Sequence, residues 1–261
     1  MARRVRRRIF PPVQMVCLHF GTARGRNSLP LMEPNMDYTY DEIAKMIDHS
    51  LLPPSLTVED LDHGCRMAID YKCASVCIMP YHLERCAGIL RGSTVKASTT
   101  IGFPHGGHAT AIKLAETKQA LSDGGEELDM VVNISKVLSG DWAYVRSEIK
   151  AIVDLAHAQG QKVKVIFENC YLKEFHKIRL CEICGEVGAD WVKTSTGFGT
   201  SGATIEDVKL MRAHSPAHVQ IKAAGGIRTL DGLLEYRALG VTRVGASKTK
   251  DILEDCRRRL I

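Results

Sequence analysis

The chain has 261 residues, of which 45% are hydrophobic, 25% charged and 6% aromatic, and this is the composition of an ordinary globular protein. It excludes the collagen-like, disordered and disulfide-rich classes. The net charge of +5 is unevenly distributed, because residues 1–35 contain seven Arg and a single acid, Glu33, whereas the rest of the chain carries 28 basic and 29 acidic residues. The nearly neutral body gives no reason to expect a nucleic-acid partner.

The basic segment predicts a division of the chain into an extension over residues 1–35 and one catalytic domain over residues 36–261. The extension could be disordered, an organelle-targeting segment or a binding arm. No run of 18 apolar residues predicts a membrane span, and the first residues lack the apolar stretch of a secretory signal. Nine Cys, an odd number at irregular spacings, fit a reducing compartment and therefore a cytoplasmic protein.

From residue 36 onward, short runs rich in Val and Ile alternate with longer stretches of helical period. The runs that predict strands span residues 45–51, 74–80, 95–103, 127–133, 163–168, 190–197, 218–226 and 241–247. The stretches that predict helices span residues 57–71, 80–90, 108–125, 142–156, 172–188, 204–214, 229–240 and 248–260. Thr57 with Asp60 and Thr204 with Asp207 are typical helix starts.

Eight strands in strict alternation with eight helices predict a single (β/α)₈ TIM barrel of the α/β class. The expected strand ends lie 23 to 39 residues apart, at Asp48, Cys77, Thr100, Asp129, Glu168, Lys193, Lys222 and Gly245. An open doubly wound sheet is the alternative, but it would require a glycine-rich fingerprint after the first strand, and the sequence has none there.

Two lysines are the candidate catalytic groups, because the carboxyl ends of barrel strands form the active-site face. Lys193 and Lys222 end consecutive strands, so each should disfavour the charge of the other, and partial burial adds to this effect. A neutral lysine is a nucleophile suited to Schiff-base formation with a carbonyl. The alternative is that one or both point outward or pair with acids. Lys164, at the start of its strand, is expected nearer the opposite rim as a supporting charge.

Asp129 is predicted to move protons near these lysines, directly or through water, or to fix a lysine in an ion pair. Asp48 with Ser50 offers a further hydrogen-bond relay, although a structural use is equally compatible with the sequence. Cys77 lies between apolar residues and is either reactive or a packed thiol. Ser50, Cys77 and Lys164 are also expected to border the substrate.

Glycine-rich loops after the last strands predict a phosphate site, where backbone N–H groups and a helix N-terminus meet. The residues of this site are Gly197, Gly225, Gly226, Gly245 and Ser247. No metal or other cofactor is expected. Cys181 and Cys184 form an isolated pair, and His105 and His108 lack an obvious third ligand.

The motifs resemble one family closely, the 2-deoxyribose-5-phosphate aldolases of the DeoC group of class I aldolases. The resemblance extends from residue 40 to about residue 253 through MIDHSLL, ASVCIMP, TTIGFPHG, ELDMVVNI, KVIFE, VKTSTGFGTSGAT, IKAAGGIRT and RVGAS. It implies that Lys193 is the Schiff-base lysine, that Lys222 perturbs it and that Asp129, assisted by Asp48, relays protons. It also implies phosphate contacts at Gly197, Gly225, Gly226 and Ser247.

Members of this family cleave 2-deoxy-D-ribose 5-phosphate reversibly to acetaldehyde and D-glyceraldehyde 3-phosphate without a cofactor, in deoxyribonucleotide and carbohydrate degradation. The resemblance therefore implies a phosphorylated sugar as the partner, and a homodimer. The chain departs from the family pattern at Ser50, Asn169 and Lys248, and Lys248 adds a positive charge beside the expected phosphate site. The alternatives are a related aldolase for another phosphorylated sugar, or a silent barrel that binds nucleic acid through its Arg-rich arm.

Overall fold

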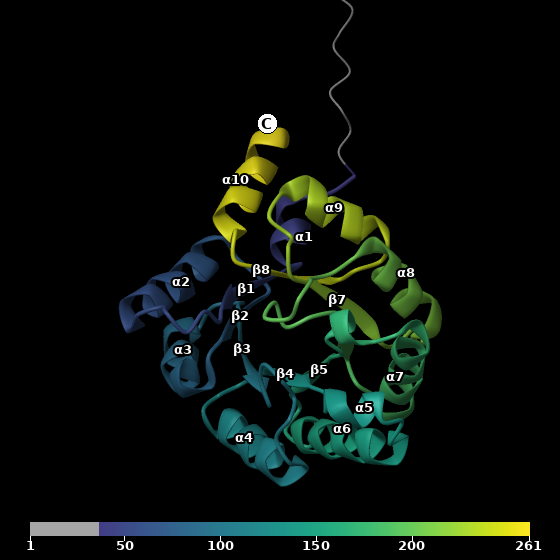
Figure 1. Ribbon diagram of the computed structural model, residues 1–261. Coiled ribbons are helices and arrows are strands. Elements are labelled where there is room, and N and C mark those ends of the chain that lie inside the picture. Colours follow the sequence, from purple (N-terminus) through teal and green to yellow (C-terminus); the bar gives the residue numbers. More distant parts are fainter. Residues whose placement is uncertain (1–36) are drawn as a thin grey trace, which may run out of the picture. The chain divides into compact units, whose positions relative to one another are not determined.

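A computed structural model describes residues 37–261, so the predicted N-terminal extension lies outside the described residues. Eight parallel strands pair in sequence order and close into a barrel, and helices surround it (Figure 1). The strands are β1 (Ile47–Leu51), β2 (Ser75–Ile78), β3 (Lys96–Ile101), β4 (Glu127–Val131), β5 (Lys162–Ile166), β6 (Trp191–Lys193), β7 (Gln220–Ala224) and β8 (Arg243–Ala246). The predicted (β/α)₈ barrel is confirmed.

One principal helix follows each strand. These helices are α2 (Val58–Asp70), α3 (Leu83–Leu90), α4 (Thr110–Ser122), α6 (Trp142–His157), α7 (Glu174–Val187), α8 (Ile205–His214), α9 (Leu230–Ala238) and α10 (Thr249–Arg259). The predicted starts of α2 and α8 are confirmed, because the Thr57 and Thr204 hydroxyls accept hydrogen bonds from the backbone N–H groups of Asp60 and Asp207.

The prediction of eight helices was incomplete, because four short elements also occur in the described chain. They are α1 (Tyr40–Ala44), α5 (Ile134–Leu138) and the 3₁₀ turns η1 (Pro80–His82) and η2 (Asn169–Tyr171). Thr39 and Glu42 form a capping box at α1, and the Asn133 side chain caps α5. These local caps stabilise helices of five residues, whose hydrophobic periodicity is too short to recognise.

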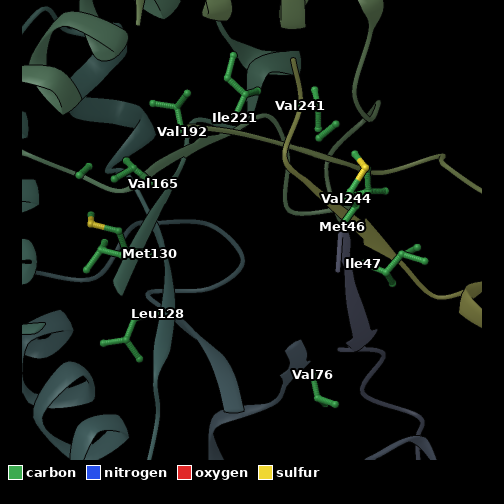
Figure 2. Close-up of a cluster of buried hydrophobic side chains, with 14 of the residues drawn as sticks. Met46, Ile47, Val76, Leu128, Met130, Val165, Val192, Ile221, Val241 and Val244 are labelled. Atoms are coloured by element: carbon green, nitrogen blue, oxygen red, sulfur yellow. The ribbon is translucent and has the colours of Figure 1, made fainter. Parts of the chain in front are cut away.

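The hydrophobic core lies between the strands and the helices. Figure 2 shows part of this layer, with Leu128 and Met130 of β4, Val165 of β5, Val192 of β6 and Ile221 of β7 around the barrel. All five side chains are fully buried. Since side chains alternate across a strand, the residues between them face the barrel interior. In β4 these are the charged residues Glu127 and Asp129, so the outer layer supplies hydrophobic burial while the interior is polar.

Four of the predicted strand ends were misplaced, and two of these are Lys222, the central residue of β7, and Asp48, the second residue of β1. Glu168 lies two residues beyond β5, with a left-handed φ of 57°, and Asp129 is the central residue of β4. The error arose because an apolar run does not show where the last ladder hydrogen bond falls, and β5 ends before the run does. Glu168 is therefore a loop residue, and Asp129 lies within the barrel.

The loop between β3 and α4 packs on the carboxyl end of β4 through a glycine. Gly106 has a φ of +66°, and a Cβ at this position would lie 1.9 Å from the carbonyl oxygen of Val132. We expect Gly106→Ala to lower the free energy of unfolding by about 2 kcal/mol or more, since it combines an unfavourable φ with a backbone clash. Urea unfolding followed by circular dichroism measures this loss.

Gly160 is the matched control, because its φ is +72° but a Cβ there would meet open space. Gly160→Ala should therefore cost only about 1 kcal/mol. Equal losses in the two variants would show that Gly106 is needed for its φ alone and not for its close approach to β4.

Candidate active site

A cavity of about 380 Å³ opens at the carboxyl end of the strands. All of the predicted site residues line it except Asp129 and Lys164, and Thr196, Phe198 and Arg228 line it as well. The structure thus brings together residues from β1, β2, β6, β7 and β8 and from the loops after them. This is the position at which (β/α)₈ barrels carry their active sites.

Asp129 lies directly beneath the cavity and joins three lysines. It is fully buried. Its Oδ2 accepts hydrogen bonds from the Nζ atoms of Lys193 and Lys222, each at 2.7 Å, while its Oδ1 accepts one from Lys164 at 3.0 Å. Burial alone would raise the pKa of Asp129, but the three ammonium groups outweigh it and hold the pKa far below its usual value. Asp129 is therefore ionised and accepts hydrogen bonds from all three lysines.

The three lysines differ in how many carboxylates each contacts. Lys164 contacts Asp48, Glu127 and Asp129, whereas Lys222 contacts only Asp48 at 2.6 Å and Asp129. Burial would lower both pKa values, but the carboxylates outweigh it and raise them. Both side chains are therefore held as ammonium ions.

Lys193 contacts a single carboxylate, that of Asp129. Burial lowers its pKa, Asp129 offsets this only in part, and the nearby charge of Lys222 lowers it further. Lys193 and Lys222 are register partners on β6 and β7, as their positions on consecutive strands predicted. Lys193 is the member of the group that most readily loses its proton, and it lines the cavity.

The expected place of Lys164 was wrong. Lys164 is the central residue of β5, not a residue of the opposite rim, and its fully buried ammonium group does not line the cavity. Its contacts with three carboxylates hold it below the site. The register explains this position, because Lys164 pairs with Asp129 across β4 and β5 and so lies at the same level of the barrel.

Two interior residues were missed, Glu127 on β4 and Arg243 on β8. Arg243 donates from Nη1 and Nη2 to Glu127, each at 2.9 Å, and from Nη1 to Asp48 at 2.7 Å. A signal was present, because Glu127 stands two residues before Asp129 and must share its face of the strand. Both residues stand at the start of their strands, whereas the predicted site residues were taken from the strand ends.

The end of the cavity that is lined by glycines is formed by close backbone approaches. Gly225 and Gly226 have φ values of 88° and 89°, and a Cβ on Gly202 would lie 2.2 Å from the carbonyl oxygen of Gly225. Gly225 requires glycine because of its φ and because a Cβ there would lie 2.8 Å from Gly202 Cα, whereas Gly202 requires glycine because of the close approach alone. Ser247 precedes the N-terminus of α10, where N–H groups favour an anion.

Arg228, on the loop after β7, is exposed and lines the same end of the cavity, and the sequence reasoning missed it. Lys248 does not line the cavity, and its Nζ lies 3.8 Å from Asp251. The extra positive charge at Lys248 is thus directed toward an acid of α10 rather than toward the cavity.

A second loop reaches the cavity after β6. The Glu168 carboxylate accepts hydrogen bonds from the backbone N–H and the hydroxyl of Thr196, and the Phe198 ring packs edge-on against Phe103 at 5.3 Å. Glu168 thus holds the loop that carries Gly197. Cys77 lines the cavity with its Sγ 3.9 Å from Asp129 Oδ2, and burial raises the pKa of its thiol.

Within residues 37–261, no group of three or more His, Cys, Asp or Glu side chains is arranged to hold a metal ion. Over the same residues, no helix is long and apolar enough to cross a membrane.

A closed parallel barrel with a buried lysine, a carboxylate and glycine loops at the carboxyl end of its strands defines a barrel enzyme. Comparison with known families makes this specific, because residues 36–246 match the model of the DeoC/LacD family aldolases. The chain belongs to this family and is an aldolase of the aldehyde-lyase class. The resemblance inferred from the motifs is confirmed.

Individual relatives support the same assignment. The deoxyribose-phosphate aldolase of Rhodopirellula baltica is 65% identical over 224 residues, which are 86% of this chain and 93% of that protein. The enzyme of the same name from Thermococcus gammatolerans is 47% identical over 83% of this chain and 97% of that protein. The tetrameric deoxyribose phosphate aldolase structure from Aeropyrum pernix has a TM-score of 0.78 and 32% identity over 85% of this chain and 94% of that chain.

Proposed function

We propose that this aldolase cleaves 2-deoxy-D-ribose 5-phosphate reversibly to acetaldehyde and D-glyceraldehyde 3-phosphate through a Schiff base on Lys193. The observation that carries the proposal is the contact pattern of the lysines, since Lys193 lines the cavity and contacts one carboxylate while its neighbours contact two or three. The names of the relatives support the choice of substrate.

The reaction starts when the neutral Lys193 amine attacks the aldehyde carbon of the open-chain sugar. The proton that the amine loses passes through Asp129 Oδ2, 2.7 Å away, to the former carbonyl oxygen and gives a carbinolamine. A second proton, taken from solvent water and returned when the final iminium ion is hydrolysed, lets this hydroxyl leave as water as the iminium ion forms. Because the pKa of Asp129 is depressed, the carboxylate holds the first proton only briefly. Protonated Lys222, on the same oxygen, stabilises the ionised Asp129.

Carbon–carbon cleavage then occurs between C2 and C3 of the sugar. The C3 hydroxyl loses its proton to a water or to Asp129, C3 becomes the aldehyde carbon of glyceraldehyde 3-phosphate, and the bonding electrons move into an enamine on Lys193. The enamine takes a proton at C2, and hydrolysis of the resulting iminium ion releases acetaldehyde and restores the amine. The cleavage needs no external oxidant or reductant, because the electrons of the broken C2–C3 bond stay in the enamine and C3 becomes an aldehyde carbon.

Substrate phosphate would bind at the other end of the cavity. Backbone N–H groups beside Gly225, Gly226 and Ser247, together with the Arg228 guanidinium, supply donors and positive charge. This places the phosphate away from Lys193 and orients the aldehyde carbon toward it. Asp48 and Ser50 line the same cavity and complete the polar wall.

A coupled assay for acetaldehyde release tests the proposed substrate. We expect turnover of deoxyribose 5-phosphate, with kcat/KM at least about 100-fold lower for deoxyribose, which lacks the charged group. Arg228→Met should raise KM for the phosphorylated sugar about 10- to 100-fold and leave KM for deoxyribose unchanged. Faster turnover of another phosphorylated sugar would instead establish the alternative aldolase.

We also propose that the enzyme is cytoplasmic and a homodimer. The eight described cysteines are all free thiols, as in a reducing compartment. The relative from Aeropyrum pernix is a tetramer, so a tetramer is the alternative to the dimer. Light scattering coupled to gel filtration distinguishes two subunits from four.

A further inference from the structure

Seven charged side chains fill the barrel beneath and around the lysine of the proposed mechanism. We call them the interior cluster: Asp48, Glu127, Asp129, Lys164, Lys193, Lys222 and Arg243. It contains three acids and four bases, so one base is in excess when all are ionised. If Lys193 is neutral, the charges balance. Because unpaired charge is costly in a buried site, this count favours loss of exactly one proton from the cluster.

Glu127, Arg243 and Lys164 are joined in the part of the cluster that does not line the cavity. The Glu127 carboxylate takes both Nη groups of Arg243 and, through Oε2, the Nζ of Lys164 at 2.6 Å. Arg243 also packs its guanidinium over the Trp191 ring, 5.0 Å from the centroid. Arg243 cannot lose its proton at ordinary pH, so the pair is a permanent charge arrangement.

Glu127 also affects the orientation of Asp129. Lys164, held by Glu127, donates to Asp129 Oδ1, and this leaves Oδ2 for Lys193 and Lys222. Neither Glu127 nor Arg243 lines the cavity. They can act on the reaction only through the groups above them.

We propose that Glu127 and Arg243 are positioning residues that set the charge at Lys193 from below the site and keep Lys193 as the base that is neutralised. The inference rests on the proposed role of Lys193 as the nucleophile. The groups that surround Lys193 in the cluster come from every neighbouring strand: Asp48 (β1), Cys77 (β2), Glu127 and Asp129 (β4), Lys164 (β5), Lys222 (β7) and Arg243 (β8), while β3 contributes the uncharged Ser98.

The two residues should act in opposite directions. Glu127→Gln removes a negative charge with little change in volume, so the ammonium form of Lys193 is disfavoured and its pKa falls. Arg243→Met removes a positive charge, so the pKa rises. A charge change at roughly 10 Å, in a medium of effective dielectric constant about 20, corresponds to about one pH unit. The double variant restores the excess of one base and should return the pKa toward the original value.

The pKa of Lys193 can be measured without substrate, from the pH dependence of its acylation by acetic anhydride, quantified by peptide mass spectrometry. We expect a midpoint about one unit lower in Glu127→Gln, about one unit higher in Arg243→Met, and close to the original in the double variant. The acid limb of kcat/KM for deoxyribose 5-phosphate should move in the same sense, since the titration of the substrate is common to all variants.

A buried ion pair outside the barrel is the matched control. Lys113 on α4 and Glu148 on α6 are both fully buried, with Nζ and Oε2 2.9 Å apart. Replacing them together by Met and Gln should lower the melting temperature and leave the Lys193 midpoint unchanged. This separates a loss of stability from an effect on charge.

Unchanged midpoints in both variants, or shifts in the same direction, would overturn the inference. If Glu127→Gln does not fold, Arg243→Met, which leaves Lys164 paired with Glu127, and the double variant still decide the question. Borohydride trapping in each variant distinguishes the two proposals, because a label on a lysine other than Lys193 contradicts the proposed function, whatever the acylation midpoints.

Discussion

Lys193→Met is expected to lower kcat by roughly 10⁴-fold or more, because the variant has no amine to form the covalent intermediate. The fold should persist, since Asp129 keeps its contacts with Lys164 and Lys222 when Lys193 is lost. The coupled assay for acetaldehyde release measures the loss, and circular dichroism verifies that the variant is folded.

Borohydride reduction in the presence of substrate provides the direct test of this role. It should add mass to the peptide that contains Lys193 in the unmodified enzyme and to no peptide in the variant. Lys162→Met is the control, because Lys162 is an exposed lysine at the amino end of β5, paired with Asp190. It should keep normal activity and normal trapping. Mass on Lys222 or Lys164 would refute the assignment of the nucleophile.

Asp129→Asn is expected to affect both stability and catalysis. The substitution removes the carboxylate shared by three buried ammonium groups, and breaking a buried ion pair costs about 3–5 kcal/mol of unfolding free energy. The proton relay of Lys193 is lost at the same time, so kcat should fall about 100-fold or more. Urea unfolding and the coupled assay measure the two effects.

Glu186→Gln is the control for this variant, since Glu186 is an exposed acid that pairs with Arg146 and Arg179 on the surface. It should change neither stability nor activity measurably. A folded Asp129→Asn variant of normal stability would show that the lysines do not depend on this carboxylate. Normal kcat in that variant would remove Asp129 from the relay.

Much of the fold could be predicted from local patterns. The barrel followed from eight apolar runs at a regular spacing, and the helix starts at Thr57 and Thr204 followed from capping chemistry between residues three apart. Positions within a strand were harder. Asp129 and Glu168 were both taken as strand ends, but one lies at the centre of β4 and the other in the loop after β5. Hydrophobicity shows which residues are buried, not where the inter-strand hydrogen bonds stop.

The residues of the candidate site could also be predicted in part from the sequence. Lys193, Lys222 and Asp129 could be recognised by the sequence alone, because a charged residue within a buried strand requires a reason. Gly225 and Gly226 after β7, and the run Gly245-Ala246-Ser247 at the end of β8, likewise predicted a phosphate site from local sequence. The resemblance to a family gave the substrate class, and the family match confirmed the enzyme class.

Only the closed barrel decided how these charges are shared. Glu127, on β4, meets Arg243, 116 residues later on β8, because the two strands face each other across the interior, and no local pattern records that contact. The register places Lys164 beside Asp129 rather than at the far rim. The number of carboxylates around each lysine, and so its protonation, is a property of this three-dimensional arrangement. The sequence determined which residues carry charge in the barrel, and the tertiary structure decided which lysine is left with a single partner.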